Sequence, residues 1–353
     1  EKILDFAVSN MDDIKDSLVY YFDVESIISA VNGKHYSGLT QSNYLKSATE
    51  LYVATKNNKY KKIARKLFNS LALPENSGGV AKYTDQGVHI KEYQTDYDEW
   101  VLNGWITAIN NIFYYYKYTN DIEANDFLTK NMQLLERLLP LYDHEEYLNT
   151  RYQLANPFYI KFVARGGVTV SDFVYEIPNE GVYDMDFSMV RPTGPRKGYT
   201  IRRCVGECEV DNNNSSIGFN KLAVFNVVGS LISHPKENKF SYKVKSNGAS
   251  KVQVYIAQGE YNPLITIMPT ESWVLVDELV FSDTNDVVQK TIEVSGKLLN
   301  KIVYPTNFKK KISGKNHNAY HFIHIEGLEK INSWYRSEEL QKYINKWIGY
   351  VNL

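Results

Sequence analysis

The strongest constraint on the fold is a change of hydrophobic period along the chain. From about Leu39 to Tyr142, apolar residues recur with the i, i+3, i+4, i+7 spacing of amphipathic helices. From Gly166-Gly167 to about Ile312 they alternate with polar residues, which is the pattern of strands. Helical spacing then returns and continues to Ile348. A region of strands therefore interrupts a region of helices.

This pattern predicts an α+β multidomain protein. Residues 1–165 are expected to form the first part of a helical domain, residues 166–315 an inserted antiparallel β-sandwich, and residues 316–353 the last helix of the helical domain. Short polar joints at Asn57-Asn58 and Thr119-Asn120 separate long helices, which indicates helical hairpins stacked side by side.

The charge and hydropathy of the chain limit the kinds of partner that we expect it to bind. With 40 Lys and Arg against 41 Asp and Glu, the chain lacks the broad positive potential of a nucleic-acid binder. No window holds 18 uninterrupted apolar residues, so we expect no membrane span. The sequence begins at Glu1 and not at Met, which leaves an upstream signal or domain open and assigns no compartment.

Cysteine and tyrosine usage adds two expectations. Cys204 and Cys208 are too few for a disulfide framework and are interpreted as incidental, with a local disulfide or a metal site as alternatives. The 28 tyrosines are expected mainly to fill a core, although aromatic faces also suit stacking on sugars. Composition thus gives only a hint of carbohydrate.

Most familiar catalytic motifs are absent from the sequence. There is no glycine-rich phosphate loop, dinucleotide fingerprint, GxSxG elbow or HExxH, so we expect no cofactor and no metal. Six of the seven histidines lie in or beside the helical segments, which places any chemistry there, although each histidine alone is more typical of a structural role.

The segment GVHIKEYQTDYDEWVLNG collects polar residues ahead of a predicted helix. Asp98 and Glu99 are explained as partners of the helix dipole and as caps. Glu92 and Tyr93 lie further upstream in an extended stretch, where that explanation fails, and Asn103 lies inside the helix. Glu92, Tyr93 and Asn103 are therefore candidates for a functional site.

Two further segments carry candidates. LPLYDHEEYLNTRYQ offers Tyr147, Arg151 and Tyr152 just after a helix, where helix termination and surface salt bridges are the alternative explanation. NHNAYHFIHIEGL offers Tyr320, His321 and His324 ahead of the final helix. The two histidines could share a helical face or bind a metal, but two ligands do not define a metal site.

Together these segments resemble the C-terminal catalytic domain of D-glucuronyl C5-epimerase. EYQTDYDEWVLNG resembles the family's EYPTxxxxFVLNG, LLERLLPLYD its LPLYD, YHFIHIEGL its YHxxHIxxL, and HYSGLTQSNYLKSATELY its glutamine-containing helix start. The resemblance covers about residues 36–162 and 316–350. It implies an incomplete (α/α) toroid, and here some 150 residues of β structure separate two motifs that the family joins directly.

The resemblance also implies roles for individual residues. Glu92, Tyr147 and Tyr320 fall on catalytic positions, with Tyr147 and Tyr152 as alternatives for one phenol because the local spacing differs from that of the family. The residues implied in substrate binding are Tyr93, Asn103, Arg151, Tyr152, His321 and His324.

The chemistry of C5 inversion requires residues of these types. Removing the C5 hydrogen of a uronate needs a base, an acid on the opposite ring face and donors for the developing enediolate. The sequence therefore predicts a polysaccharide uronyl C5-epimerase whose partner is a uronate-containing, heparosan-like glycan, with a homodimer left open. A polysaccharide lyase that uses the same carbanion and a non-catalytic glycan-binding protein are the alternatives.

Overall fold

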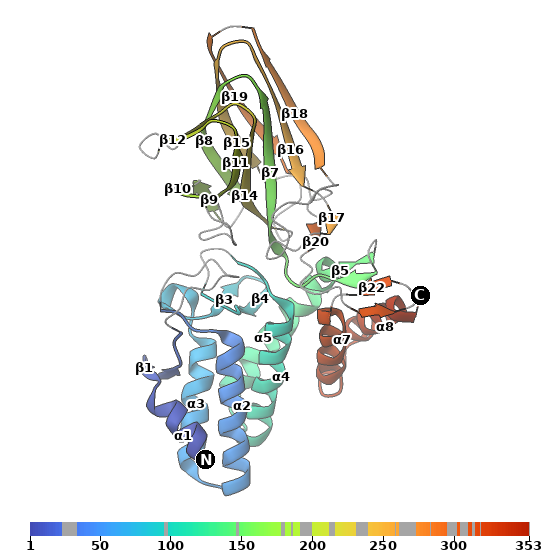
Figure 1. The fold of residues 1–353 in the computed structure, drawn as a ribbon. Coiled ribbons are helices and arrows are strands. Elements are labelled where there is room, and N and C mark those ends of the chain that lie inside the picture. The colour runs from blue at the N-terminus through green and yellow to red at the C-terminus, as the bar shows by residue number, and fades with distance from the viewer. Residues whose placement is uncertain are drawn as a thin grey trace.

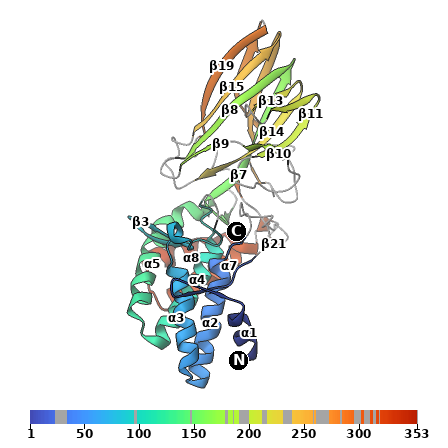
Figure 2. The same cartoon turned by 90° about the vertical axis from the view of Figure 1, so that its left-hand side faces the viewer.

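The protein has a helical part and a β part that stands beyond one end of the helices, and both termini lie in the helical part (Figures 1 and 2). The computed structural model describes residues 1–22, 34–94, 98–145, 148–177, 181–184, 186–190, 200–211, 216–230, 239–257, 259–260, 273–282, 284–294, 302–303, 310–312, 315–317 and 319–352. No described helix is both long and apolar enough to cross a bilayer.

The helical part consists mainly of consecutive helices that pack in pairs. Its helices are α1 (Lys2–Ser9), α2 (Gly38–Thr55), α3 (Asn58–Ala72), α4 (Leu102–Thr119), α5 (Ile122–Tyr142), α7 (Ala319–Asn332) and α8 (Glu338–Asn352), with a 3-10 turn at Glu75–Ser77. α2 packs on α3 and α4, and α4 also packs on α5 and α7. α4 is therefore the central helix of this part (Figure 1).

The polar joints between helices lie where the sequence predicts them. α2 ends at Lys56, which adopts the left-handed conformation, and Asn57 caps α3 by accepting a hydrogen bond from the Lys59 amide. At the second joint Asn120 is left-handed and Asp121 caps α5. Asn57 and Asp121 accept amide hydrogen bonds and Asn120 tolerates a left-handed backbone, which explains a turn at these positions.

The C-terminal segment contains two helices, α7 and α8, where the sequence predicts one. The side-chain hydroxyl of Ser337 accepts a hydrogen bond from the Leu340 amide and so caps the start of α8. Trp334, in the break between the helices, stacks on Phe113 of α4 with ring centroids 3.9 Å apart. A continuous hydrophobic pattern hid this break because Trp334 is apolar and packs although it lies outside both helices.

Short strands complete the helical part and its junction with the β part. They are the hairpins β1 (Asp12–Ile14) with β2 (Ser17–Val19), β3 (Ala81–Thr84) with β4 (Gly87–Ile90), β5 (Asp143–His144) with β6 (Asn149–Thr150) and β21 (Lys310–Ile312) with β22 (Lys315–His317), and the parallel pair β17 (Gly259–Glu260) with β20 (Ile302–Val303).

The β part contains two sheets. The first has the order β10 (Asp186–Val190), β11 (Thr200–Val205), β14 (Leu222–Ser230), β7 (Ala155–Arg165), β16 (Ser250–Ala257), β18 (Trp273–Phe281). The second has the order β12 (Cys208–Asp211), β13 (Ser216–Phe219), β8 (Val168–Ile177), β15 (Lys239–Asn247), β19 (Thr284–Glu293), with β9 (Gly181–Asp184) beside β8.

Aromatic side chains join the two sheets. Phe162 of β7 contacts Phe173 of β8 and Tyr242 of β15, with ring centroids 5.7 and 5.1 Å apart. All three are buried, so the inner faces of the sheets share one core. The mixed α+β class that the sequence predicts is confirmed.

The β part begins earlier than the boundary at residue 166 that the sequence predicts. β7 starts at Ala155 and pairs with β14 and β16 in the middle of the first sheet. Gly166, with a positive φ of 97°, lies in the turn from β7 into β8. The glycine pair therefore marks a turn inside the β part and not its start.

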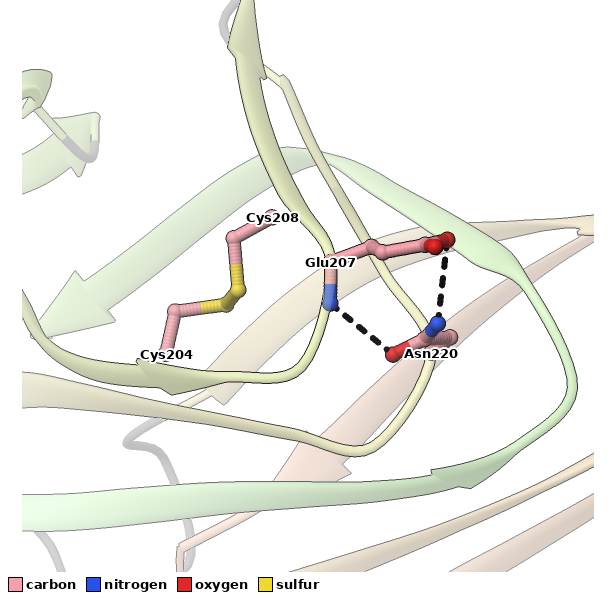
Figure 3. Close-up of a disulfide and its surroundings, with 4 residues drawn as sticks. All are labelled: Cys204, Glu207, Cys208 and Asn220. Carbon is pink, nitrogen blue, oxygen red and sulfur yellow. Dashed lines mark hydrogen bonds between the residues drawn. A yellow bond between two sulfur atoms is a disulfide. The ribbon is translucent and has the colours of Figure 1, made fainter.

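Cys204 and Cys208 form a disulfide, so their interpretation as incidental is wrong and the alternative of a local disulfide is confirmed (Figure 3). Cys204 belongs to β11 of the first sheet and Cys208 to β12 of the second. Beside it, Asn220 accepts a hydrogen bond from the Glu207 amide and donates one to the Glu207 carboxylate (Figure 3). The disulfide links β11, the second strand of the first sheet, to β12, an edge strand of the second sheet.

The close packing of α7 on α4 depends on Gly327. A Cβ atom at this position would lie 2.4 Å from Cγ2 of Ile106 on α4. The Gly327 carbonyl accepts a hydrogen bond of 3.2 Å from the Asn110 side chain, which fixes the contact. α7 thus lies closer to α4 than a residue with a side chain would allow.

We predict that Gly327→Ala lowers the free energy of unfolding by about 1–3 kcal/mol, because the added methyl group overpacks this contact. Gly349→Ala in α8 is the matched control, because a Cβ there meets no atom within 4 Å. The control should raise stability by about 0.5–1 kcal/mol through helix propensity. Denaturant unfolding measures both, and equal shifts in the two variants would contradict the packing explanation.

Candidate active site

Glu92 is positioned by the end of β4 and the start of α2. Its backbone carbonyl accepts a hydrogen bond of 3.0 Å from the amide of Gly38, the first residue of α2. Ser37 pairs with Tyr93 in an isolated β-bridge. A Cβ at position 38 would lie 2.4 Å from the Lys91 carbonyl oxygen, so a glycine is needed for this approach.

Tyr152 reaches the same place from the segment that follows β6. Its hydroxyl donates a hydrogen bond of 3.4 Å to Oε2 of Glu92. Its ring contacts that of Tyr320, in the first turn of α7, with centroids 4.6 Å apart. Val101, Tyr152 and Tyr320 form a small apolar cluster separate from the main core. Three distant segments therefore meet at one carboxyl group.

Burial changes the acidity of these groups. Glu92 is only 7% exposed, and burial raises the pKa of its carboxyl to about 7, although hydrogen bonds from Tyr152 and Tyr93 partly offset the shift. Burial and the nearby Glu92 charge raise the pKa of both the Tyr93 and Tyr320 phenols above the usual value. The carboxyl can thus exchange a proton near neutral pH while these phenols keep theirs.

The first turn of α4 forms a wall against Glu92. A Cβ at position 104 would lie 2.9 Å from Oε2 of Glu92, so Gly104 lets the carboxyl lie against the helix. The side-chain oxygen of the preceding residue, Asn103, is buried and has no hydrogen-bond partner among the described residues. It is an acceptor that a bound polar molecule could satisfy.

The acidic residues ahead of α4 have a role other than the predicted one. α4 begins at Leu102 with Val101 as N-cap and no capping side chain. Asp98 forms ion pairs with Lys82 and Lys91 instead, and the Lys91 pair measures 3.1 Å. The backbone carbonyl of Glu99 accepts a hydrogen bond from the Leu154 amide. The prediction that Asp98 and Glu99 cap the helix is wrong.

The structure describes Arg151 but not Tyr147. Arg151 is 3% exposed, and its amide donates a hydrogen bond of 2.8 Å to the Tyr142 carbonyl, so it is no surface salt-bridge residue. Tyr147, the first choice for one catalytic phenol, lies outside the described residues. Tyr152, the other candidate for that phenol, lies beside Glu92.

His321 and His324 lie against one hydroxyl group, that of Thr150. Nδ1 of His324 is 2.8 Å and Nδ1 of His321 3.3 Å from Oγ1 of Thr150, and Nε2 of His321 is 3.0 Å from the Trp347 carbonyl. Sequence reasoning missed Thr150, because nothing in the pattern sets it apart from other threonines. The i, i+3 spacing of the histidines was the available signal.

This arrangement assigns both tautomers. A carbonyl only accepts, so Nε2 of His321 carries a proton and its Nδ1 accepts from Thr150. The hydroxyl then accepts from Nδ1–H of His324, which leaves Nε2 of His324 as a bare lone pair with no partner in the described part of the chain. Burial lowers the pKa to about 4 for His321 and about 3 for His324, so both are neutral at pH 7.

No group of three or more His, Cys, Asp or Glu side chains within the described ranges is arranged to hold a metal ion. The site so far consists of a buried carboxyl, two phenols in contact with it and a third beside them, an unsatisfied amide oxygen and a neutral imidazole. These groups can accept, donate and relay protons. They suit acid–base chemistry on a bound polar molecule.

Residues 16–164 match the family model described as D-glucuronyl C5-epimerase C-terminus. The match confirms the resemblance over this stretch, which includes Glu92, Asn103 and Tyr152. Residues 316–350 lie beyond the match, so the resemblance of α7 and α8 stays a prediction. No curated protein matches the sequence.

Solved structures with local similarity include two cellobiose 2-epimerases, from Spirochaeta thermophila DSM 6192 (16% identity, TM-score 0.32) and Bacillus thermoamylovorans B4167 (14%, 0.31). A sugar epimerase from a ruminal bacterium is also similar (14%, 0.33). The alignments cover 42–43% of this chain and 36–37% of those chains. At these values they carry no argument about activity.

We predict that nitrogen-15 NMR of histidine-labelled protein finds His321 as the Nε2–H tautomer and His324 as the Nδ1–H tautomer. Thr150→Val removes the bridging hydroxyl and should cost about 1–3 kcal/mol of stability, because buried ring nitrogens lose their partner. Thr150→Ser keeps the hydroxyl and should keep both tautomers. Finding Nε2–H at both histidines of the unsubstituted protein would contradict the assignment.

Proposed function

We propose that the protein is a polysaccharide uronyl C5-epimerase that inverts C5 of glucuronate residues in a heparosan-like glycan. The observation that carries the proposal is the Glu92 carboxyl, whose pKa is raised to about 7 and which lies in contact with phenols. A general base is most effective when its pKa is near the working pH. The family match over residues 16–164 supports the same reaction class.

In the proposed reaction, the ionised Glu92 carboxylate takes the proton from C5, and the electron pair moves into the neighbouring carboxylate as an enediolate. A phenol on the other ring face then donates its proton to C5 and is reprotonated from solvent. Tyr320 is the described residue suited to this step, with Tyr147 as the alternative, because Tyr152 donates to Glu92 and so lies on the same side of the substrate as the base. The raised pKa of Tyr320 keeps that phenol protonated before the step.

Substrate binding is assigned to the groups around this pair. The buried Asn103 oxygen, which has no partner among the described residues, can accept from a sugar hydroxyl. Arg151 is proposed to bind the uronate carboxylate, since a guanidinium matches a carboxylate with two parallel hydrogen bonds. The hydroxyl and ring of Tyr93 are further proposed contacts.

We propose that the neutral His324, which lies beside Tyr320, acts as a hydrogen-bond acceptor through its Nε2 lone pair. Its ring lies 6.3 Å from that of Tyr320, and the Thr150 bridge holds its Nε2 lone pair free of a proton.

We further propose that the helix pairs are part of an incomplete (α/α) toroid and that the two sheets form an inserted β-sandwich. A homodimer is left open in this proposal.

We predict that incubation with heparosan in deuterated water introduces deuterium at C5 of uronate residues and yields both epimers. Proton abstraction from C5 is the common step, so NMR of the polymer detects it directly. Exchange accompanied by an unsaturated, ultraviolet-absorbing chain end would replace the epimerase with a lyase. No deuterium in any uronate-containing glycan would sink both.

We predict that kcat/KM for C5 exchange rises with pH through about 7, because only ionised Glu92 can accept the proton. Glu92→Gln keeps the shape of the side chain and should lower turnover on the order of 10²-fold or more while glycan affinity is retained. The control is Glu326→Gln, an exposed carboxylate of α7. A pH profile that is unchanged by Glu92→Gln would place the base elsewhere.

A further inference from the structure

The outer face of the first sheet carries an aromatic and cationic cluster, made of Lys161, Tyr255, Trp273 and Leu275. Lys161 of β7 pairs in register with Tyr255 of β16, which pairs with Leu275 of β18, so these residues form one cross-strand row. Trp273 begins β18 opposite Ala257, on the same face.

The strand pattern shows that this row points away from the core. Phe162, Val254 and Ile256 alternate with the row residues and are buried against the second sheet. Leu275, by contrast, is 47% exposed, and Lys161, Tyr255 and Trp273 are partly exposed. The cluster is therefore a surface feature of the β part.

The Lys161 ammonium makes cation–π contacts with two aromatic rings. Its Nζ lies 4.1 Å from the centroid of Trp273 and 4.6 Å from that of Tyr255. It has no carboxylate partner among the described residues, whereas Lys251 of the same face pairs with Glu278 at 2.8 Å and Lys243 of the second sheet pairs with Asp172 at 2.6 Å. The Tyr255 hydroxyl donates to Gln253, which fixes its ring beside the ammonium.

Partial burial of this ammonium favours an anionic neighbour. Burial against the two rings removes part of the hydration of this ammonium and lowers the pKa of Lys161. A carboxylate that bound there would compensate this loss. The aromatic rings at the same place offer a flat apolar surface against which a sugar ring can stack.

We propose that this cluster is a second glycan-binding site, which takes a uronate residue with its carboxylate on Lys161 and its ring against the aromatic side chains. The choice of a uronate glycan over other anions rests on the proposed function. Sugar and carboxylate occur in one residue of such a polymer, which matches a site that offers rings and a single cation together.

The location of this cluster suits the binding of a long polysaccharide. β7 runs from Ala155 towards Arg165 and pairs with β16 in antiparallel register, so the end of β16 at Ala257 lies beside the start of β7. Trp273 pairs with Ala257 and therefore lies at this same end of the sheet. Figure 1 shows that this end of β7 and β16 is the one next to the helices. A polymer held there would remain tethered to the protein between reactions at Glu92, and its effective concentration at the active site would rise.

The test measures binding of a glucuronate-containing heparosan oligosaccharide by titration calorimetry in the Glu92→Gln background, which stops turnover. Lys161→Gln should weaken binding about tenfold, as expected for the loss of one charge-assisted contact. Lys161→Arg, which keeps the charge, should retain most of the affinity. Lys243→Gln is the matched control, because it removes a lysine that already has a carboxylate partner.

A second ligand isolates the carboxylate. The same oligosaccharide with its uronates reduced to glucose should bind the parent protein and the Lys161→Gln variant equally. Equal affinity of Lys161→Gln and the parent protein for the acidic oligosaccharide would overturn the proposal, as would no binding at all. If Lys161→Gln does not fold by circular dichroism, Trp273→Ala takes its place, and unchanged affinity of that variant for the acidic oligosaccharide overturns the site.

Failure of this site and failure of the proposed function are separable. Deuterium exchange at C5 with Lys161-independent binding would remove the second site and leave the epimerase. Lys161-dependent binding without exchange on any uronate glycan would remove the epimerase and leave a glycan-binding β part.

Discussion

The candidate site depends on one constraint, which is that the Glu92 carboxyl is buried against the first turn of α4 where Gly104 has no side chain. Burial raises its pKa to about 7, and the same carboxyl accepts hydrogen bonds from Tyr152 and Tyr93. A larger residue at position 104 would displace the carboxyl, and a more exposed carboxyl would lose its ability to exchange protons near neutral pH. Packing and acidity therefore have the same origin.

The other parts of the helical domain serve to bring partners to this carboxyl. Gly327 lets α7 approach α4 closely, which carries Tyr320 to Tyr152. Thr150 connects the β5–β6 hairpin to both histidines of α7. The stack of Trp334 on Phe113 secures the far end of the same helix. α4 and α7 thus behave as one unit although they are far apart in the sequence.

The hydrophobic period and the short motifs of the sequence predicted much of the fold and of the candidate site. The helix pairs, the strand region and the proximity of Glu92 to Tyr152 and Tyr320 follow from local patterns and from the family resemblance. The start of the β part at Ala155 was missed because the Gly166-Gly167 pair was taken as the boundary, although Asn156-Pro157 lies at the start of β7. Asp98 was assigned to a cap because sequence alone does not show that Lys82 and Lys91 approach it.

The long separation between α4 and α7 has a consequence for folding order. The hydrogen bond from Asn110 to Gly327 joins residues 217 positions apart, and the one between Thr150 and His324 joins residues 174 apart. During synthesis from the N-terminus, the strands of the β part emerge before α7 and α8, so the sheets can form while the helical body still exposes the surface that α7 will cover. Contacts of such high sequence separation form late and slowly. The half-built helical body is thus the stage of biogenesis most exposed to aggregation or chaperone binding.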